Sequence, residues 1–165
     1  MSESTPRPGS RQPAQAADQA APSREAVLRR TAVAIGATFL LVGVAGFIPG
    51  ITTDYDRLTF AGHSSGAQLL GVFDVSVLHD LVHLAFGVAG LALARTASGA
   101  RWYLVGGGLV YLALTAYGAL VDRASDANFV PLDHADNWLH LGLGLGMLLL
   151  GLVLPVRDRV EPWQR

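Results

Sequence analysis

Two histidines four residues apart carry the clearest chemical signal in this sequence. The segment His79-Asp80-Leu81-Val82-His83 places both imidazoles on one face of a helix, as zinc proteases do, with the Asp80 carboxylate beside them as a base. Asp80 is one methylene shorter than the glutamate of that motif, which puts the base role in doubt. His140 is the candidate for a third ligand, so His79, His83 and His140 form a predicted site for a divalent metal ion.

The same histidines allow two other interpretations. Two histidines on facing helices of a bundle can hold haem iron between them, and His83 and His140 suit that role. Alternatively, a histidine and a carboxylate can hydrogen-bond within or between helices and only stabilise the packing, as Asp80 and His83 could. The sequence leaves metal, haem and packing open.

An internal repeat relates the two regions that contain these residues. Residues 80–87 and 137–144 share the pattern [DN]-x-x-H-L-x-x-G, which aligns His83 with His140. We expect two helical hairpins related by an axis along the membrane normal. The two histidines would then lie at equal depth and face each other.

The histidines belong to a larger polar cluster in apolar surroundings. An aspartate in the middle of a membrane helix costs roughly 2.5–3.5 kcal/mol, so such groups are expected near an interface or turned inward. The predicted cluster, in the outer half of the bundle, comprises Asp74, His79, Asp80, His83, Asp136, Asn137 and His140.

Four long apolar segments must position the cluster. Hydrophobic residues make up 51% of the 165-residue chain and charged residues only 15%, against about 25% in soluble domains. We expect an all-α, four-helix integral membrane domain over residues 26–156. Its spans are predicted near residues 31–50, 67–94, 102–121 and 138–155. The polar residues 1–25 are expected to form a disordered tail, and residues 157–165 a second tail.

The remaining composition narrows the location and the partners. The chain has no cysteine, which excludes thiolate sites, and its net charge of −1 gives no reason to expect nucleic acid. Ten of its twelve arginines fall in residues 1–30, the 95–101 turn and residues 157–165, so the positive-inside rule predicts that both termini are cytoplasmic. We expect a multi-pass protein of a bacterial inner membrane whose partners are the bilayer and either a second copy or another membrane protein.

Glycines are expected where the helices approach one another, because they let backbones come close. The predicted packing positions are Gly43, Gly46, Gly87, Gly90, Gly142 and Gly146, the last two as a small-xxx-small pair.

Several of these segments resemble a known family. Residues 49–52 (PGIT), 79–83 (HDLVH) and 136–140 (DNWLH) are similar to motifs of small four-helix membrane proteins of actinobacteria, grouped as a domain of unknown function, family 4383. The resemblance covers about residues 32–154. It implies a bacterial inner-membrane protein and brings no activity or catalytic residue with it.

Three classes of function are consistent with the sequence. The first prediction is a structural or accessory membrane protein without enzyme activity, whose polar cluster packs helices. The second is a metal- or haem-binding redox protein that uses His83 and His140. The third is a subunit of a small-solute or proton-linked transporter, although the cytoplasmic halves of the spans offer almost no polar side chains for a path.

Overall fold

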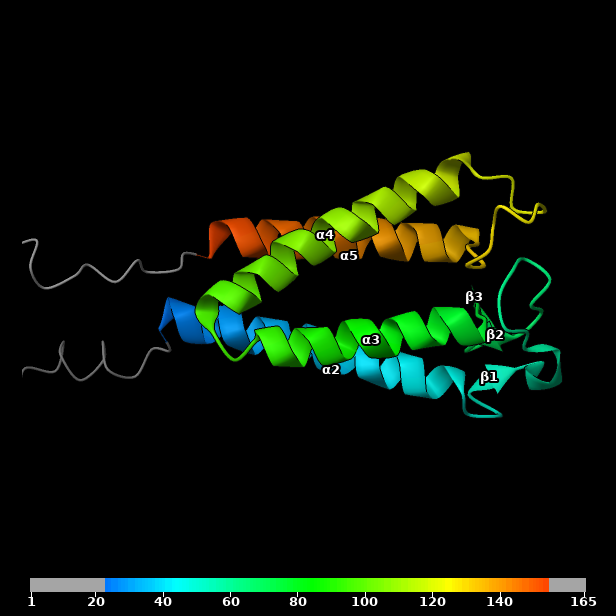
Figure 1. The fold of residues 1–165 in the computed structure, drawn as a ribbon, viewed down its shortest axis with the longest axis horizontal. Coiled ribbons are helices and arrows are strands. Elements are labelled where there is room, and N and C mark those ends of the chain that lie inside the picture. Colours follow the sequence, from blue (N-terminus) through cyan, green and yellow to red (C-terminus); the bar gives the residue numbers. More distant parts are fainter. Residues whose placement is uncertain (1–22, 155–165) are drawn as a thin grey trace, which may run out of the picture.

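The computed structural model describes residues 23–154, which form four helices with a small sheet at one end of the bundle (Figure 1). The helices are α2 (Arg24–Gly46), α3 (Val77–Leu93), α4 (Ala97–Leu120) and α5 (His134–Val153). Strands β1 (Thr52–Thr53), β2 (Gln68–Leu69) and β3 (Phe73–Asp74) and the 3-10 helix η1 (Tyr55–Arg57) lie between α2 and α3. The end of the bundle that carries the strands is called the sheet end below.

The structure confirms a four-helix membrane bundle. Helices α2, α4 and α5 are each long and apolar enough to cross a membrane, and α3 is a shorter apolar helix of 17 residues. At 1.5 Å per residue, α3 is about 26 Å long, slightly less than a hydrocarbon core of about 30 Å. The sheet end therefore lies close to the membrane interface, next to the start of α3.

Side-chain caps explain why three helices begin earlier than expected. Ser23 accepts a hydrogen bond from the backbone N–H of Ala26, so α2 begins at Arg24 rather than near residue 31. Arg24 and Glu25 are thus helical, which corrects the predicted tail of residues 1–25. Thr96 starts α4 and Asp133 starts α5 in the same way, each about four or five residues before the predicted boundary. The rest of the two predicted tails lies outside the described residues.

The prediction of a second span from residue 67 is wrong over its first ten residues. Residues 67–76 form β2, a tight turn and β3, and β2 pairs with β1 and β3 in an antiparallel sheet. The turn needs left-handed backbone at Leu70 (φ 55°) and Gly71 (φ 68°), a conformation that interrupts a helix and that glycine adopts readily. Ser76 then accepts from the N–H of His79 and starts α3 at Val77.

Helices α2 and α3 form one tightly packed hairpin. Added Cβ atoms at Gly36 and Gly87 would each approach the other residue's carbonyl oxygen, to 3.1 and 2.7 Å. Nearer the sheet end, a Cβ at Gly46 would overlap the carboxylate of Asp80. The Gly36 and Gly87 contacts require glycine because the two backbones approach closely there.

Helices α4 and α5 repeat this arrangement in the second hairpin. An added Cβ at Gly108 would lie 2.8 Å from the carbonyl oxygen of Gly144, and one at Gly118 would overlap the amide of Asn137. Four pairs of positions are therefore equivalent in the two hairpins: Gly36 and Gly108, Gly87 and Gly144, Gly46 and Gly118, and Asp80 and Asn137. The two hairpins have the same internal contacts and form a structural repeat.

Two of the predicted packing glycines do not pack. Added Cβ atoms at Gly142 and Gly146 would meet nothing within 4 Å among residues 23–154, so the expected small-xxx-small contact is wrong for this bundle. Gly144 lies between them in sequence and therefore faces a different side of α5, where it meets Gly108. Gly43, Gly46, Gly87 and Gly90 all lie at close helix contacts.

The two hairpins meet through α4. Aromatic rings fill this junction, with Phe39 of α2 stacked on Tyr111 of α4 at 5.4 Å and Phe86 of α3 edge-on to Tyr111 at 5.5 Å. Helix α4 contacts both α2 and α3, whereas α5 contacts α4 and β3 and comes much less close to α2 and α3. Helix α4 therefore joins the two hairpins, whereas α2 and α5 have few direct contacts with each other.

Candidate metal centre

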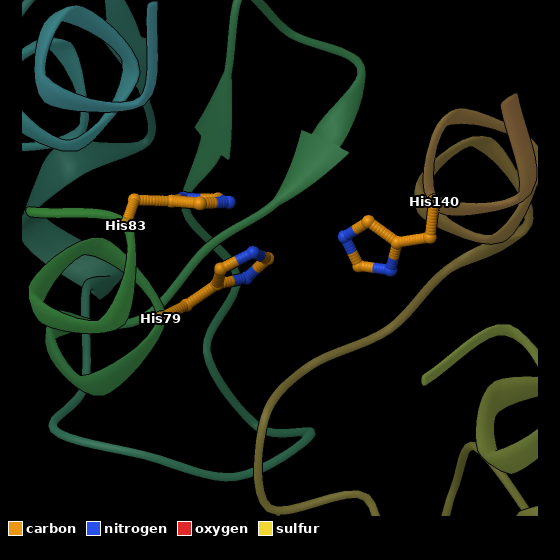
Figure 2. Close-up of side chains that lie close together, drawn as sticks. All are labelled: His79, His83 and His140. Atoms are coloured by element: carbon orange, nitrogen blue, oxygen red, sulfur yellow. The ribbon is translucent and has the colours of Figure 1, made fainter. Parts of the chain in front are cut away.

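Three histidines converge inside the bundle near the sheet end. His79 and His83 project from α3 toward His140, which projects from α5 (Figure 2). One ring nitrogen of each lies within 4.8 Å of the nitrogens offered by the other two. The rings of His79 and His83 are 4.6 Å apart between centroids, and those of His79 and His140 are 6.4 Å apart. These three residues are called the histidine cluster below.

The repeat explains how the cluster is assembled. His79 and His83 are four residues apart on α3, and Asp136 and His140 are four residues apart on α5, so each helix turns two polar side chains to one face. The N-caps Ser76 and Asp133 begin the two helices at equivalent positions. In the repeat, His83 corresponds to His140 and His79 corresponds to Asp136.

Aromatic side chains at equivalent positions of α2 and α4 hold two of the imidazoles. Phe39 stacks on His83 with centroids 5.7 Å apart, and Tyr111 meets His140 edge-on at 5.0 Å. Because Phe39 also stacks on Tyr111, the four rings form a continuous row across the interface between the hairpins. Such packing restricts the rotamers of His83 and His140 and orients their nitrogens.

The ring nitrogens have unused binding capacity. Among the described residues, the buried Nδ1 atoms of His79, His83 and His140 have no hydrogen-bond partner. His79 and His140 are each 3% exposed, so bulk solvent has little access to them. A buried polar atom without a partner is costly, which makes a bound ligand a natural explanation for three such atoms in one place.

The spacing of the cluster suits a single ion. Zn–N bonds of 2.0–2.1 Å in a tetrahedral site place the nitrogens about 3.3 Å apart. The widest nitrogen separation of 4.8 Å must therefore shorten by roughly 1.5 Å, a change that small rotations of three side chains can supply.

The two residues predicted to lie beside the histidines face elsewhere. The carboxylate of Asp80 is fully buried against Gly46 of α2, and neither of its oxygens has a partner among residues 23–154. Asn137 packs against Gly118 of α4 in the equivalent place. Neither lines the cavity next to the histidine cluster, so Asp80 is not placed to act as the base that the sequence motif predicted.

The other two predicted acidic residues lie at the sheet end. Asp136 is 2% exposed, shares a capping box with Asp133 and lines the same cavity as the histidines. Asp74 belongs to β3, accepts from the side-chain amide of Gln68 and donates its backbone N–H to Asp133 at 3.3 Å. Asp74 therefore joins the segments that cover the histidine cluster. Asp136 lies beside the histidine cluster.

A cavity of about 260 Å³ extends from the histidine cluster into the space between α2 and α5. Its walls are mostly apolar, with Phe39 and Val42 on one side and Leu139 and Leu143 on the other. Phe73 and neighbouring residues of the sheet close its end. No sequence pattern indicates this cavity, because its walls are ordinary apolar residues of helices and of a connecting segment that folds over them.

Contacts between the two connecting segments close the sheet end. Gly62 donates its backbone N–H to the carbonyl of Phe129 at 2.7 Å, and His63 lies 3.9 Å from the carboxylate of Asp126. Together with the bond between Asp74 and Asp133, these contacts hold the 47–76 and 121–133 segments over the histidine cluster.

A family model described as "Domain of unknown function (DUF4383)" matches residues 29–153, which include the histidine cluster, α3, α4, α5 and α2 from Arg29 onward. No curated protein and no solved structure matches the chain.

Proposed function

Since the chain belongs to the DUF4383 family, which brings no known activity, we propose a function from geometry: the protein binds a transition-metal ion in the membrane through His79, His83 and His140. The observation that carries this proposal is the convergence of three imidazole nitrogens within 4.8 Å of one another. Three histidine ligands with one open position are typical of catalytic zinc, and imidazole also suits copper, nickel, iron and cobalt.

The unpartnered nitrogens favour metal binding over a purely structural role. In a packing role, the imidazoles would be expected to hydrogen-bond to a carboxylate, yet Asp80 turns to Gly46 and the three buried Nδ1 atoms have no partner within residues 23–154. A metal ion would bind one nitrogen from each of three imidazoles that already lie close together.

The third histidine also favours an ion over haem. Haem held by His83 and His140 would need a flat space between the two rings for the macrocycle. His79 has its nitrogen within 4.8 Å of both and occupies part of that space. The trihistidine arrangement fits a small ion without moving a helix.

We place the protein in a bacterial inner membrane with four spans and both ends in the cytoplasm. The arginine distribution supports this orientation, since residues 1–30, the 95–101 turn and residues 157–165 hold ten of the twelve arginines. The sheet end and the histidine cluster then lie on the outer side of the membrane.

The test compares metal binding by single variants purified in mild detergent. His79→Leu, His83→Leu and His140→Leu each remove one ligand, and His134→Leu is the matched control because His134 is an exposed histidine on the same helix as His140. We expect one Zn²⁺ or Co²⁺ per chain in the wild type and in the control. Loss of outer-shell partners alone costs about 10–100-fold in affinity, so each ligand variant should lose more than about 100-fold.

The stability of the metal-free proteins provides the second measurement. Wild-type protein that binds no more metal than the triple leucine variant would refute the proposal, provided that both are folded. In that case, and with little change in stability, the cluster would be a packing element.

A further inference from the structure

We infer that the cavity beside the histidine cluster binds a flat lipophilic molecule with a single oxygen at one end, which enters sideways from the membrane. The inference rests on the proposed function, because the oxygen would occupy the open position of the ion held by the three histidines.

The cavity lies on the side of the bundle where the two hairpins have the fewest contacts. Helix α4 closes the bundle against α2 and α3 through the Phe39, Phe86 and Tyr111 rings. Helix α5 has no comparable contact with α2, and the cavity occupies that side. Its rim includes Leu139 and Leu70, which are 45% and 67% exposed, so the mouth is apolar and faces hydrocarbon or the interface.

The aqueous route to the same cavity is covered. The sheet and the 121–133 segment lie over the histidines and are joined by the Asp74–Asp133 and Gly62–Phe129 hydrogen bonds. A polar solute would have to displace these contacts, whereas a lipid-soluble molecule reaches the apolar mouth directly. The two routes therefore select for a lipophilic ligand.

The lining selects the shape and polarity of the ligand. Polar groups gather at one end, where His79, His83, His140 and Asp136 face the cavity, and the long walls on α2 and α5 are mainly aliphatic. An apolar cavity of about 150 Å³ holds benzene. The cavity of about 260 Å³ here has room for a body of one or two rings with its oxygen toward the histidines.

The test measures binding of 1-naphthol, with naphthalene as the matched compound that lacks the oxygen. The protein is held in nanodiscs, and empty nanodiscs give the background of partitioning into lipid. Leu139→Trp fills the mouth of the cavity, and Leu145→Trp is its control, because Leu145 is 53% exposed on the same helix and does not line the cavity.

We expect saturable binding of 1-naphthol, at least tenfold weaker binding of naphthalene, and a tenfold or greater loss in Leu139→Trp but not in Leu145→Trp. In the Co²⁺-loaded protein, 1-naphthol should also shift the visible absorption bands of the metal. Equal binding to the two tryptophan variants, or equal binding of both compounds, would overturn the inference.

A failure of the proposed function gives a different result. If the chain binds no Co²⁺ while 1-naphthol still binds in a way that Leu139→Trp abolishes, the cavity takes the ligand and the metal site is wrong. If Co²⁺ binds but 1-naphthol leaves its spectrum unchanged while filling the cavity, direct ligation of the metal by the oxygen is refuted.

Discussion

Replacing Gly46 by alanine tests the tight packing that turns Asp80 away from the histidines. A Cβ at Gly46 would overlap the Cγ and both oxygens of the Asp80 carboxylate. Asp80 is fully buried, so its carboxylate cannot swing into solvent. Helix α2 also lies close to the α3 backbone at Gly43, where an added Cβ would come within 2.9 Å of the backbone oxygen of Asp80. Overpacking of this kind costs about 1–3 kcal/mol.

The expected loss for Gly46→Ala is therefore about 1–3 kcal/mol in the free energy of unfolding, measured by circular dichroism as denaturing detergent is added to mild detergent. Gly142→Ala is the control, because a Cβ there meets nothing within 4 Å in the described part of the chain. It should be neutral or stabilising, since alanine is favoured over glycine in a helix by up to about 1 kcal/mol.

A double-mutant cycle isolates the contact itself. Asp80→Ala removes the carboxylate that Gly46→Ala would strike, so the double variant should be more stable than the sum of the single effects predicts. Residues in contact give coupling energies of about 0.5–3 kcal/mol. The packing described for this hairpin would be refuted if Gly46→Ala had the same free energy of unfolding as Gly142→Ala. A double-mutant cycle without a coupling energy would refute it as well.

Three further predictions concern the second hairpin, the helix caps and the topology. Gly108→Ala should destabilise the protein by about 1–3 kcal/mol, because its Cβ would meet the backbone of α5, whereas Gly106→Ala should not; equal unfolding curves would contradict the repeat. Asp133→Ala removes the cap of α5 and the acceptor of the Asp74 N–H and should cost at least about 0.5–2 kcal/mol in the same assay, with exposed Asp56→Ala unchanged. A reporter fused within residues 95–101 should read cytoplasmic and one near Asp126 external, and the reverse result would overturn the orientation.

The sequence predicted the elements that depend on local pattern. Long apolar runs predicted four helices, and the [DN]-x-x-H-L-x-x-G repeat aligned His83 with His140, which the structure places in one cluster. The family resemblance is confirmed by the match over residues 29–153. These features could be predicted because hydrophobic length and helical periodicity act within a single segment.

The features that were missed depend on how segments meet. The sheet at residues 52–74 arises from short strand pairs and left-handed backbone at Leu70 and Gly71, which an apolar run conceals. The prediction that Gly142 and Gly146 pack against another helix rests on their four-residue spacing alone. The repeat aligns Gly87 with Gly144, and this alignment correctly indicates Gly144 as the glycine of α5 that packs against α4.

The repeat could also have predicted the row of aromatic rings. Aligning Gly36 and Gly46 with Gly108 and Gly118 sets Phe39 opposite Tyr111, the two rings that contact His83 and His140. The direction of the Asp80 side chain could not be predicted in this way, because it depends on which face of α3 packs against α2.

X-ray absorption spectroscopy of the Zn²⁺-loaded protein in mild detergent tests the metal centre most directly. The account predicts one zinc per chain with about three imidazole nitrogens at 2.0–2.1 Å, and fewer in the His79→Leu, His83→Leu and His140→Leu variants. The exposed-site variant His134→Leu should give the wild-type spectrum. A shell of oxygens without imidazole scattering, or a spectrum that no cluster variant changes, would contradict the assignment of His79, His83 and His140 as a metal site.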